Sequence, residues 1–258
     1  MGSASREALA VAKEALSGSL DTSAGAELLA ASAQIDGSPA LLAALADSAT
    51  AGSAKAELVE RLFAGISAGA RSVLSAAVAQ SWSQPSELVA GVEELGLRAG
   101  ANAAPALADE LLAAAAAVDS NHELELVLGN KLGDNDAKVQ LVGRLFTGKL
   151  SSAAVDIVKH LIANPRGRRI SNSLRAAATV VADQGGSELA TVTVAAPLNE
   201  LQLARISGLL EKNAGRPVRV TTVVDPSLVG GVRIQIGDDV IDGSVRTRLD
   251  DLRLQLAG

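Results

Sequence analysis

The stretch "VVDPSLVGGVRIQIGDDVIDGSVRTRLDDL", Val223–Leu252, determines how the end of this chain folds. Apolar and polar residues alternate along much of it, a pattern typical of half-buried β-strands. Asp-Pro, Gly-Gly and Asp-Asp pairs interrupt the alternation, and such pairs favour turns. After Gly243 the apolar period lengthens to that of a helix. The stretch therefore predicts a small piece of sheet followed by a final helix.

Strand-like alternation extends on both sides of the first turn in this stretch. It covers "ELATVTVAA" (188–196), "PVRVTTVV" (217–224), "LVGGVRIQIG" (228–237) and, more briefly, "DVIDGSV" (239–245). The Gly230-Gly231 pair suggests a bulge or a close backbone approach. These segments predict a short mixed sheet.

Two helices complete the expected module. In "PLNELQLARISGLLEKNAG" (197–215), Asn199 and Gln202 form a capping box and Gly215 is a stop signal. The final segment carries an apolar stripe with arginines on the other faces: Val245, Leu249, Leu252 and Leu256, with Arg246, Arg248 and Arg253. We therefore expect a compact α+β domain over residues 187–258.

The part of the chain before this module contains an internal repeat. Ala26–Phe63 and Asp109–Phe146, aligned without a gap at an offset of 83, agree at 16 of 38 positions. Only four of the matches pair alanine with alanine, and the shared pattern "AK..LV.RLF" is not what compositional bias produces. Residues 5–17 resemble 86–99, and the segments after Phe63 and Phe146 match once one residue of slack is allowed. The sequence predicts a duplicated helical segment.

Each repeat reads as several short amphipathic helices separated by Gly, Ser, Pro and Asn. Short loops between helices favour antiparallel packing, so each repeat is expected to form a bundle, with Phe63 and Phe146 as equivalent core anchors. The expected fold class is α+β, with a first helical repeat at 1–102, a second at 103–186 and the α+β domain at 187–258.

Composition excludes several functional classes. The chain has 23 basic and 29 acidic residues, a net charge of −6, which disfavours a broad surface for nucleic acid or anionic membrane. Cysteine and tyrosine are absent, and only two phenylalanines and one tryptophan are available for stacking on a base, sugar or cofactor. No apolar run approaches the length of a membrane span. The N-terminus is too charged for a secretory signal.

Catalytic and metal-binding patterns are also lacking. His122 and His160 have no histidine partner at helical spacing, and neither is expected to act as a metal ligand or general base. The carboxylate pairs, Glu93-Glu94, Asp238-Asp239 and Asp250-Asp251, are sequence neighbours whose side chains point apart. We expect no enzyme activity, cofactor or metal.

The one basic concentration is "NPRGRRISNSLR", which contains Arg166, Arg168, Arg169 and Arg175. A solvated turn between helices is the favoured interpretation, followed by a protein-binding surface. An RNA-binding role is disfavoured because no aromatic residues are interleaved with the arginines.

The C-terminal stretch resembles the signature of the delta subunit of F-type ATP synthase, a family that includes the mitochondrial oligomycin-sensitivity-conferring protein. The elements that carry the resemblance are Asp225-Pro226, Leu228, Gly230-Gly231, the alternating Val232-Ile234-Ile236, and Asp242-Gly243-Ser244 before the last helix. "TVTVAAPLNELQLARI" also resembles the family, and the N-terminal "REALAVAKEAL" does so more loosely.

The resemblance implies a non-catalytic stator component. Similar proteins use a helical bundle to grip N-terminal helices of the alpha subunits, and a C-terminal module to hold the C-terminal helix of the b subunit. For alpha, we expect contacts on the helices that carry Arg6, Lys13, Arg71, Val155 and Lys159. For b, we expect contacts at Val232, Ile234, Arg246, Leu249 and Arg253. The resemblance also implies a peripheral position at the cytoplasmic face of the cell membrane. Because no membrane-spanning segment is found, we expect no covalent fusion to a b helix.

The chain departs from the family pattern, because family members usually have one helical bundle and this sequence has its pattern twice. Either the second copy holds the usual place and the first is added, or the first keeps the alpha-binding face and the second is a spacer. The alternative function is a helical adaptor that binds another macromolecular partner. An RNA-binding module or an enzyme would need surfaces that the sequence does not indicate.

Overall fold

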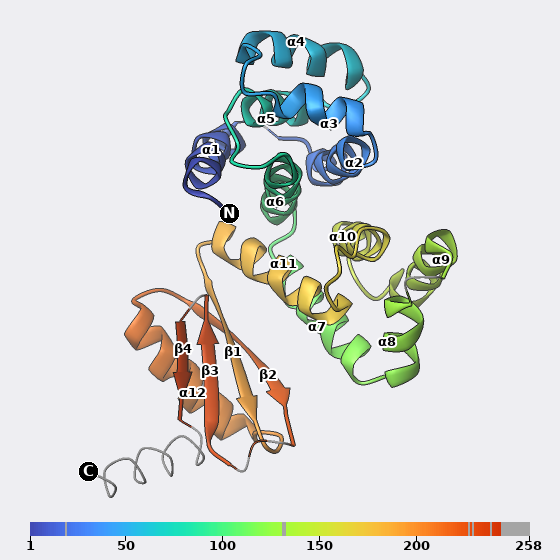
Figure 1. Cartoon of the computed structure of the whole chain (residues 1–258). Coiled ribbons are helices and arrows are strands. Elements are labelled where there is room, and N and C mark those ends of the chain that lie inside the picture. The colour runs from blue at the N-terminus through green and yellow to red at the C-terminus, as the bar shows by residue number, and fades with distance from the viewer. Residues whose placement is uncertain (19, 131–132, 227, 229, 238, 244–258) are drawn as a thin grey trace, which may run out of the picture. The chain divides into compact units, whose positions relative to one another are not determined.

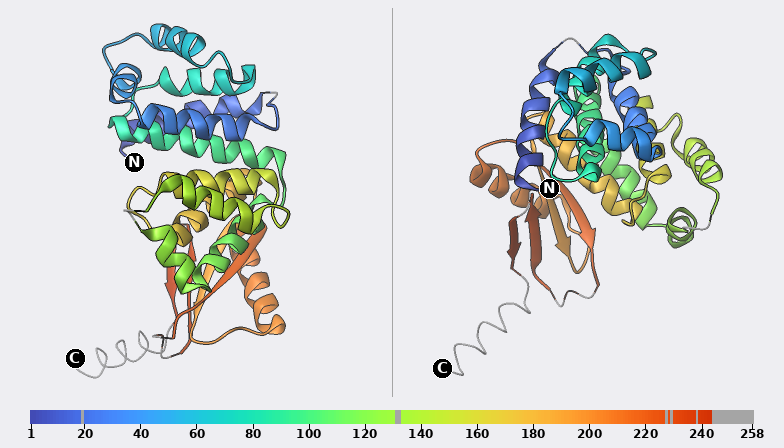
Figure 2. Two further views of the ribbon diagram at one scale, coloured as in Figure 1. Left: turned by 90° about the vertical axis from the view of Figure 1, so that its right-hand side faces the viewer. Right: turned by 45° about the horizontal axis from the view of Figure 1, so that its top comes forward.

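The computed structural model describes the chain except residues 19, 131–132, 227, 229, 238 and 244–258. It divides into two compact units, Met1–Val181 and Ala182–Gly258 (Figures 1 and 2). The boundary lies within the last helix of the helical part, whereas the sequence pattern placed it after residue 186. The described part is helical first and ends in a mixed sheet, so the predicted α+β class is confirmed.

Eleven α-helices make up the helical part among the described residues, and one short 3-10 turn, Ala15–Ser17, follows the first. They are α1 (Ser3–Glu14), α2 (Ala24–Asp36), α3 (Pro39–Ala46), α4 (Gly52–Leu62), α5 (Ala68–Val78), α6 (Pro85–Ala103), α7 (Leu107–Asp119), α8 (His122–Gly129), α9 (Asn135–Phe146), α10 (Ser152–Ala163) and α11 (Ile170–Gln184). Short polar or Gly- and Pro-containing connections separate them, as expected.

The helix boundaries follow the sequence repeat. α7, α8 and α9 each begin 83 residues after α2, α3 and α4 (107 − 24, 122 − 39 and 135 − 52), and α10 begins 84 residues after α5 (152 − 68). We call α1–α6 the first helical set and α7–α11 the second. The duplication itself stays a prediction about origin, but α2–α5 and α7–α10 share their order, and their paired helices differ in length by at most one residue.

Equivalent polar contacts also recur in the two sets. Ser67 donates from its amide and hydroxyl to Glu27, at 3.0 and 2.6 Å, and Ser151 donates in the same two ways to Glu110. Each serine also caps its helix, α5 or α10, by accepting from a backbone amide three residues on. This arrangement ties the start of one helix to the first turn of another, and it fixes the loop before α5 and α10 in both sets.

The core of the first set is built from small and aliphatic side chains. Leu28, Ile35 and Leu45 are fully buried, and Phe63 is 4% exposed within the same cluster. Phe146 is 7% exposed at the matching place in the second set. Both phenylalanines therefore serve as core anchors, as predicted.

The crossing of α2 and α6 depends on glycine. A Cβ atom added at Gly25 would lie 2.8 Å from the Gly100 amide nitrogen and 3.0 Å from the Gly96 carbonyl oxygen. Both atoms belong to the backbone of α6, so they cannot rotate away. The position 83 residues after Gly25 is Ala108, on α7. The first set can therefore bring two helix backbones closer than the second set can at this place.

The second unit is a four-stranded sheet with one described helix against it. Its elements are β1 (Glu188–Val194), α12 (Glu200–Ala214), β2 (Val218–Val224), β3 (Val232–Ile236) and β4 (Asp239–Asp242). The strand order is β2-β1-β3-β4, with β1 and β2 parallel and the other two pairs antiparallel (Figure 1). The predicted mixed sheet is therefore confirmed, while the predicted helix at 245–256 lies outside the described residues.

The predicted ends of α12 are confirmed. Asn199 and Gln202 form the reciprocal capping box, with hydrogen bonds of 2.9 and 3.0 Å. Gly215 follows the helix with φ of 67°, a left-handed conformation that favours glycine. These local signals place α12 between the parallel strands β1 and β2, as the crossover that parallel pairing requires.

We predict that Gly25→Ala destabilises the helical unit by about 1–3 kcal/mol, because its methyl group would push α2 off the α6 backbone. Alanine is otherwise the better helix former, so without the clash the substitution would stabilise by about 0.5–1 kcal/mol. Urea unfolding followed by circular dichroism measures the change. Gly143→Ala in α9 is the matched control, since its nearest neighbour would be the flexible end of Lys159 at 3.4 Å. A Gly25→Ala chain as stable as the control would contradict the proposed role of the glycine.

We also predict that Glu27 makes the helical unit sensitive to acid. Burial raises the pKa of its carboxyl, but hydrogen bonds from Ser67 and Ser23 outweigh burial and leave the pKa below its ordinary value. A lowered folded pKa gives stability that is present above the unfolded pKa of about 4.3 and lost as pH falls through the folded pKa. The stability advantage of the natural chain over Glu27→Gln should therefore be largest near neutral pH and shrink on acidification. Thermal melts across pH test this, and an advantage that grows toward acid pH would refute it. Ser67→Ala should reduce the same dependence.

Candidate partner-binding surfaces

The described histidine and acidic side chains are dispersed or already bonded. No group of three or more His, Asp or Glu side chains among them is placed to hold a metal ion. His122 lies at the exposed start of α8, and His160 is occupied by a hydrogen bond to Glu93.

The predicted alpha-contact residues of the first set differ in how many contacts their charged groups already make within the chain. Arg6 is exposed on α1, and its Nη1 donates to the Met1 carbonyl at 2.9 Å. The Lys13 ammonium lies 3.2 Å from Glu94. Arg71 lies 2.7 Å from Glu60 through Nε, and its Nη1 donates to the carbonyls of Ala64 and Ile66. Lys13 and Arg71 thus already form ion pairs and hydrogen bonds that connect helices and loops within their own set.

On α10 the two predicted residues are both at least half-buried. Val155 is only 6% exposed and belongs to the core, so it offers little side-chain surface to a partner. Lys159 is half-buried, and it lies close to Gly143 of α9. The sequence pattern could not separate these roles, because a buried valine and an interfacial valine occupy the same position of a helical stripe.

The basic stretch at residues 166–175 is largely neutralised within the helical unit. Arg166 lies 3.0 Å from Glu93 and Arg169 lies 3.6 Å from Glu125, while Arg175 pairs with Asp119. Three of its four arginines therefore have carboxylate partners. Such pairing lowers the local positive potential that nucleic-acid binding would need.

Glu93 connects α6 with α10 and the loop that follows it. Its carboxylate accepts from His160 Nε2 at 3.1 Å and pairs with Arg166 at 3.0 Å. The His160 side chain is 7% exposed, and Arg166 is the one non-glycine residue with positive φ, 43°, in the described part of the chain. Since a positive φ is costly for arginine, its ion pair holds the loop in an otherwise unfavourable conformation.

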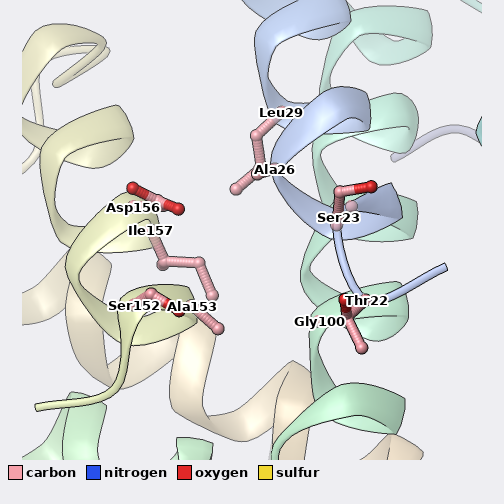
Figure 3. Close-up of a pocket in the computed structure, with 11 residues that line it drawn as sticks. Thr22, Ser23, Ala26, Leu29, Gly100, Ser152, Ala153, Asp156 and Ile157 are labelled. Carbon is pink, nitrogen blue, oxygen red and sulfur yellow. The ribbon is translucent and has the colours of Figure 1, made fainter. Parts of the chain in front are cut away.

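A pocket of about 290 Å³ lies between α2, α6 and α10 (Figure 3). Ala26 and Leu29 of α2 line one side and Ala153, Asp156 and Ile157 of α10 the other, with glycines of α6 between them. The pocket therefore lies where the first helical set meets the second.

A second pocket, of about 500 Å³, lies beside α8. Leu126, which lines it, is 60% exposed, and the next residue, Val127, is 49% exposed. The positions 83 residues earlier hold Ala43 and Ala44. The second set thus exposes larger apolar side chains here. The aligned sequences already pair these alanines with leucine and valine, but only the structure shows that the larger side chains are exposed.

In the second unit, one face of the sheet packs on α12. Ala190, Leu210 and Val218 are buried there, and Ile234 packs against them. Val232, a predicted b contact, is half-buried on the same face as Ile234. Ile241 is paired with Ile234 and is 55% exposed. The part of this face over β3 and β4 therefore has apolar surface that no described residue covers.

The residues of the C-terminal signature shape the connections of the sheet. Asp225 donates its amide to Val194 at 2.8 Å, and Gly243 donates to Val232 at 2.9 Å. Gly230 and Gly231 have φ of 143° and 84°, which favour glycine. Asp242 pairs with Arg233 at 3.2 Å, and Pro226 follows Asp225 in the turn. Arg246, Leu249 and Arg253 lie outside the described residues.

Within the described part of the chain, no single helix has the length and apolar character needed to cross a bilayer. The bent pair α2 and α3 passes that test by length and composition only.

A helical unit followed by a small four-stranded mixed sheet makes this an α+β protein. Residues 97–256 match the family model described as ATP synthase delta (OSCP) subunit. The chain belongs to this family. The match covers the second helical set and the C-terminal module, and it leaves most of the first set outside.

Relatives extend the similarity over the whole chain. An ATP synthase subunit delta of Leifsonia xyli is 44% identical over all of both chains, and one of Streptomyces coelicolor is 36% identical over 100% of this chain and 98% of its own. A chain from the cryo-EM structure of the Toxoplasma gondii mitochondrial ATP synthase hexamer aligns at 22% identity. It covers 58% of this chain and 85% of that one with a TM-score of 0.38, too low to compare the folds.

We predict that Glu93→Ala destabilises the helical unit by about 1–3 kcal/mol, since it leaves the His160 side chain, which is only 7% exposed, without its acceptor. Glu125→Ala is the matched control, because its partner Arg169 is 77% exposed. That change should cost no more than about 0.5 kcal/mol. Urea unfolding of both variants measures the difference, and equal costs would show that the Glu93 contacts act as ordinary surface pairs.

Proposed function

We propose that this chain is the delta subunit of an F-type ATP synthase and works in the peripheral stalk as a non-catalytic connector. The observation that carries the proposal is the family match over residues 97–256, together with full-length relatives of the same name. In this role the protein links the alpha subunits of the catalytic head to the b subunit. It thereby resists the torque that accompanies proton-driven ATP synthesis.

Resisting torque requires stiff packing and firm interfaces, not reactive groups. The helical unit supports such a role through its close α2–α6 crossing and through polar ties between neighbouring helices. Interiors packed at crystal-like density transmit strain with little deformation. Stiff packing of this kind lets a connector hold a load without any catalytic group.

For the alpha subunits, we propose that an amphipathic N-terminal helix binds on the helical unit. Arg6 on α1 and the outward side of α5 supply exposed surface there. Amphipathic helices bind such surfaces by inserting apolar residues at helical spacing. Lys13, Arg71, Val155 and Lys159 would then position the helices that carry the surface more than they contact the partner.

For the b subunit, we propose binding to the sheet over β3 and β4, next to α12. Ile234 and Val232 supply a half-buried floor and Ile241 the exposed apolar surface. Arg246, Leu249 and Arg253 belong to the same proposal, as members of the segment that follows β4. A helix seated there would cover apolar area that is now open to water.

As part of the ATP synthase, the chain would be peripheral at the cytoplasmic face of the cell membrane.

The second candidate function is a helical adaptor for another macromolecule, favoured by the exposed Leu126 and Val127 beside the α8 pocket. The two candidates differ in which partner binds tightly.

Calorimetric titration of the full chain with peptides of the alpha N-terminal helix and the b C-terminal helix tests the proposal. We predict that Ile241→Asp weakens binding of the b peptide about tenfold or more, because a carboxylate would be buried against the peptide. Gln235→Asp is the matched control, as an exposed residue of β3 on the opposite face. Binding of neither peptide to the natural chain would reject the stator role in favour of the adaptor, and equal losses in both variants would reject the proposed b surface.

A further inference from the structure

The sheet of the second unit has two edge strands that differ in length and composition. Among the described residues, β2 lies at one edge of the sheet and β4 at the other (Figure 1). β4 has four residues with a carboxylate at each end, Asp239 and Asp242. β2 has seven residues, VRVTTVV, and every one except Arg219 is β-branched. Edge strands are usually short or carry charges and prolines that prevent pairing with another chain. β4 follows this rule, and β2 does not.

Two hydrogen bonds show which main-chain groups of β2 point toward β1. The Glu188 amide donates to the Pro217 carbonyl at 2.8 Å. The Asp225 amide donates to the Val194 carbonyl, also at 2.8 Å. Between these bonds the two strands are parallel and in continuous register. In a parallel ladder, alternate residues turn both N–H and C=O toward the neighbouring strand. The residues of β2 that do so are Arg219, Thr221 and Val223.

The other residues of β2 turn their main-chain groups to the open side of the strand. They are Val218, Val220, Thr222 and Val224. In the described part of the chain, β2 pairs with no strand except β1. Thr222 is exposed, and Val224 is 46% exposed. The edge therefore presents four N–H and four C=O groups, repeated about every 6.6 Å along the strand.

The side chains of β2 define what a strand added at this edge would carry. Val218 and Val220 lie on the face that packs against α12. On the opposite face are the half-buried Arg219, Thr221 and Val223, and Arg219 is the only charged residue of the strand. Cross-strand neighbours are most stable when apolar groups meet and opposite charges meet. The matching strand has apolar residues beside α12, and polar residues with a carboxylate beside Arg219 on the other face.

The open main-chain groups require an extended partner. A helix uses its own main-chain donors and acceptors internally, so it has none to offer to β2. An extended segment presents donors and acceptors at the spacing of a strand, and it binds by adding itself to the sheet. A helical partner, such as the one proposed for β3 and β4, would leave the β2 edge unpaired.

We infer that the β2 edge binds an extended segment of a neighbouring synthase subunit, which adds a fifth strand to the sheet. The segment alternates apolar and polar residues and places a carboxylate beside Arg219. This inference rests on the proposed stator function. It gives the second unit a contact that is distinct from the helix-binding surface on β3 and β4, and one that depends on main-chain groups.

Hydrogen exchange with single-residue resolution tests the inference in the full-length chain and in the purified synthase. In the isolated chain, we expect the Thr222 and Val224 amides to exchange quickly, because water is their partner. The Thr221 and Val223 amides should exchange slowly, because they donate to β1. In the assembled synthase, exchange at Thr222 and Val224 should slow about tenfold or more if an added strand accepts from them.

Proline substitutions test the same geometry through binding. Thr222→Pro removes an outward amide and should leave the β1 ladder intact, whereas Thr221→Pro removes a ladder bond and should destabilise the chain. Thr222→Val keeps the amide and changes only the side chain. Each variant is added to synthase depleted of this subunit, and its apparent affinity is measured. We expect Thr222→Pro to bind about tenfold or more weakly and Thr222→Val to bind within about twofold of the natural chain.

Several results would overturn the inference. They are slow exchange at Thr222 and Val224 in the isolated chain, unchanged exchange in the synthase, and normal incorporation of Thr222→Pro. A Thr222→Pro chain as unstable as Thr221→Pro would contradict the outward direction of the amide. Protection that grows with the concentration of the isolated chain would assign the edge to a second copy instead. If the natural chain does not enter the synthase, the stator function fails and this inference fails with it. Incorporation without slowed exchange rejects the inference alone.

Discussion

The helical unit depends on the absence of a side chain at Gly25. With only hydrogen at this position, the α2 backbone approaches α6 to a distance that a single methyl group would prevent. α2 then has its other side free to meet α10, and the two helical sets come into contact along it. One missing methyl group therefore affects both the packing inside the first set and the joining of the first set to the second.

The two sets share internal hydrogen bonds and core anchors but differ in the side chains on their outer surfaces. Glu27 with Ser67 and Glu110 with Ser151 make the same hydrogen bonds, and Phe63 and Phe146 anchor the same place in each core. The differences lie on the outer sides of the helices. Where the first set has small or polar side chains, as at Ala43 or Ser72, the second often has larger apolar or charged ones. Two bundles with the same framework can in this way serve different neighbours.

Much of this fold could be predicted from the sequence, because its strongest signals are local. The capping box at Asn199, the stop at Gly215 and the alternation in β1–β3 each depend on a few consecutive residues. The roles of Val155 and Lys13 could not be predicted in the same way. Whether a valine in a helical stripe is buried, or a lysine finds a glutamate 81 residues away (94 − 13), depends on packing that the stripe itself does not specify. The partner-binding surfaces likewise depend on tertiary packing and could not be predicted from local sequence signals.

A connector under load gains from having the interface between its own parts formed before any partner arrives. A bundle attached by a flexible linker would lose conformational entropy each time the load aligned it. Part of the applied rotation would then move the bundle on its linker and would not be resisted. Here α2 meets α6 by backbone contact through glycines, and a partly buried Glu93–His160 pair joins α6 to α10, and neither contact needs a partner. The helical unit thus resists relative motion of its two sets. A second helical set needs this property if it is to lengthen a stator without making it more flexible.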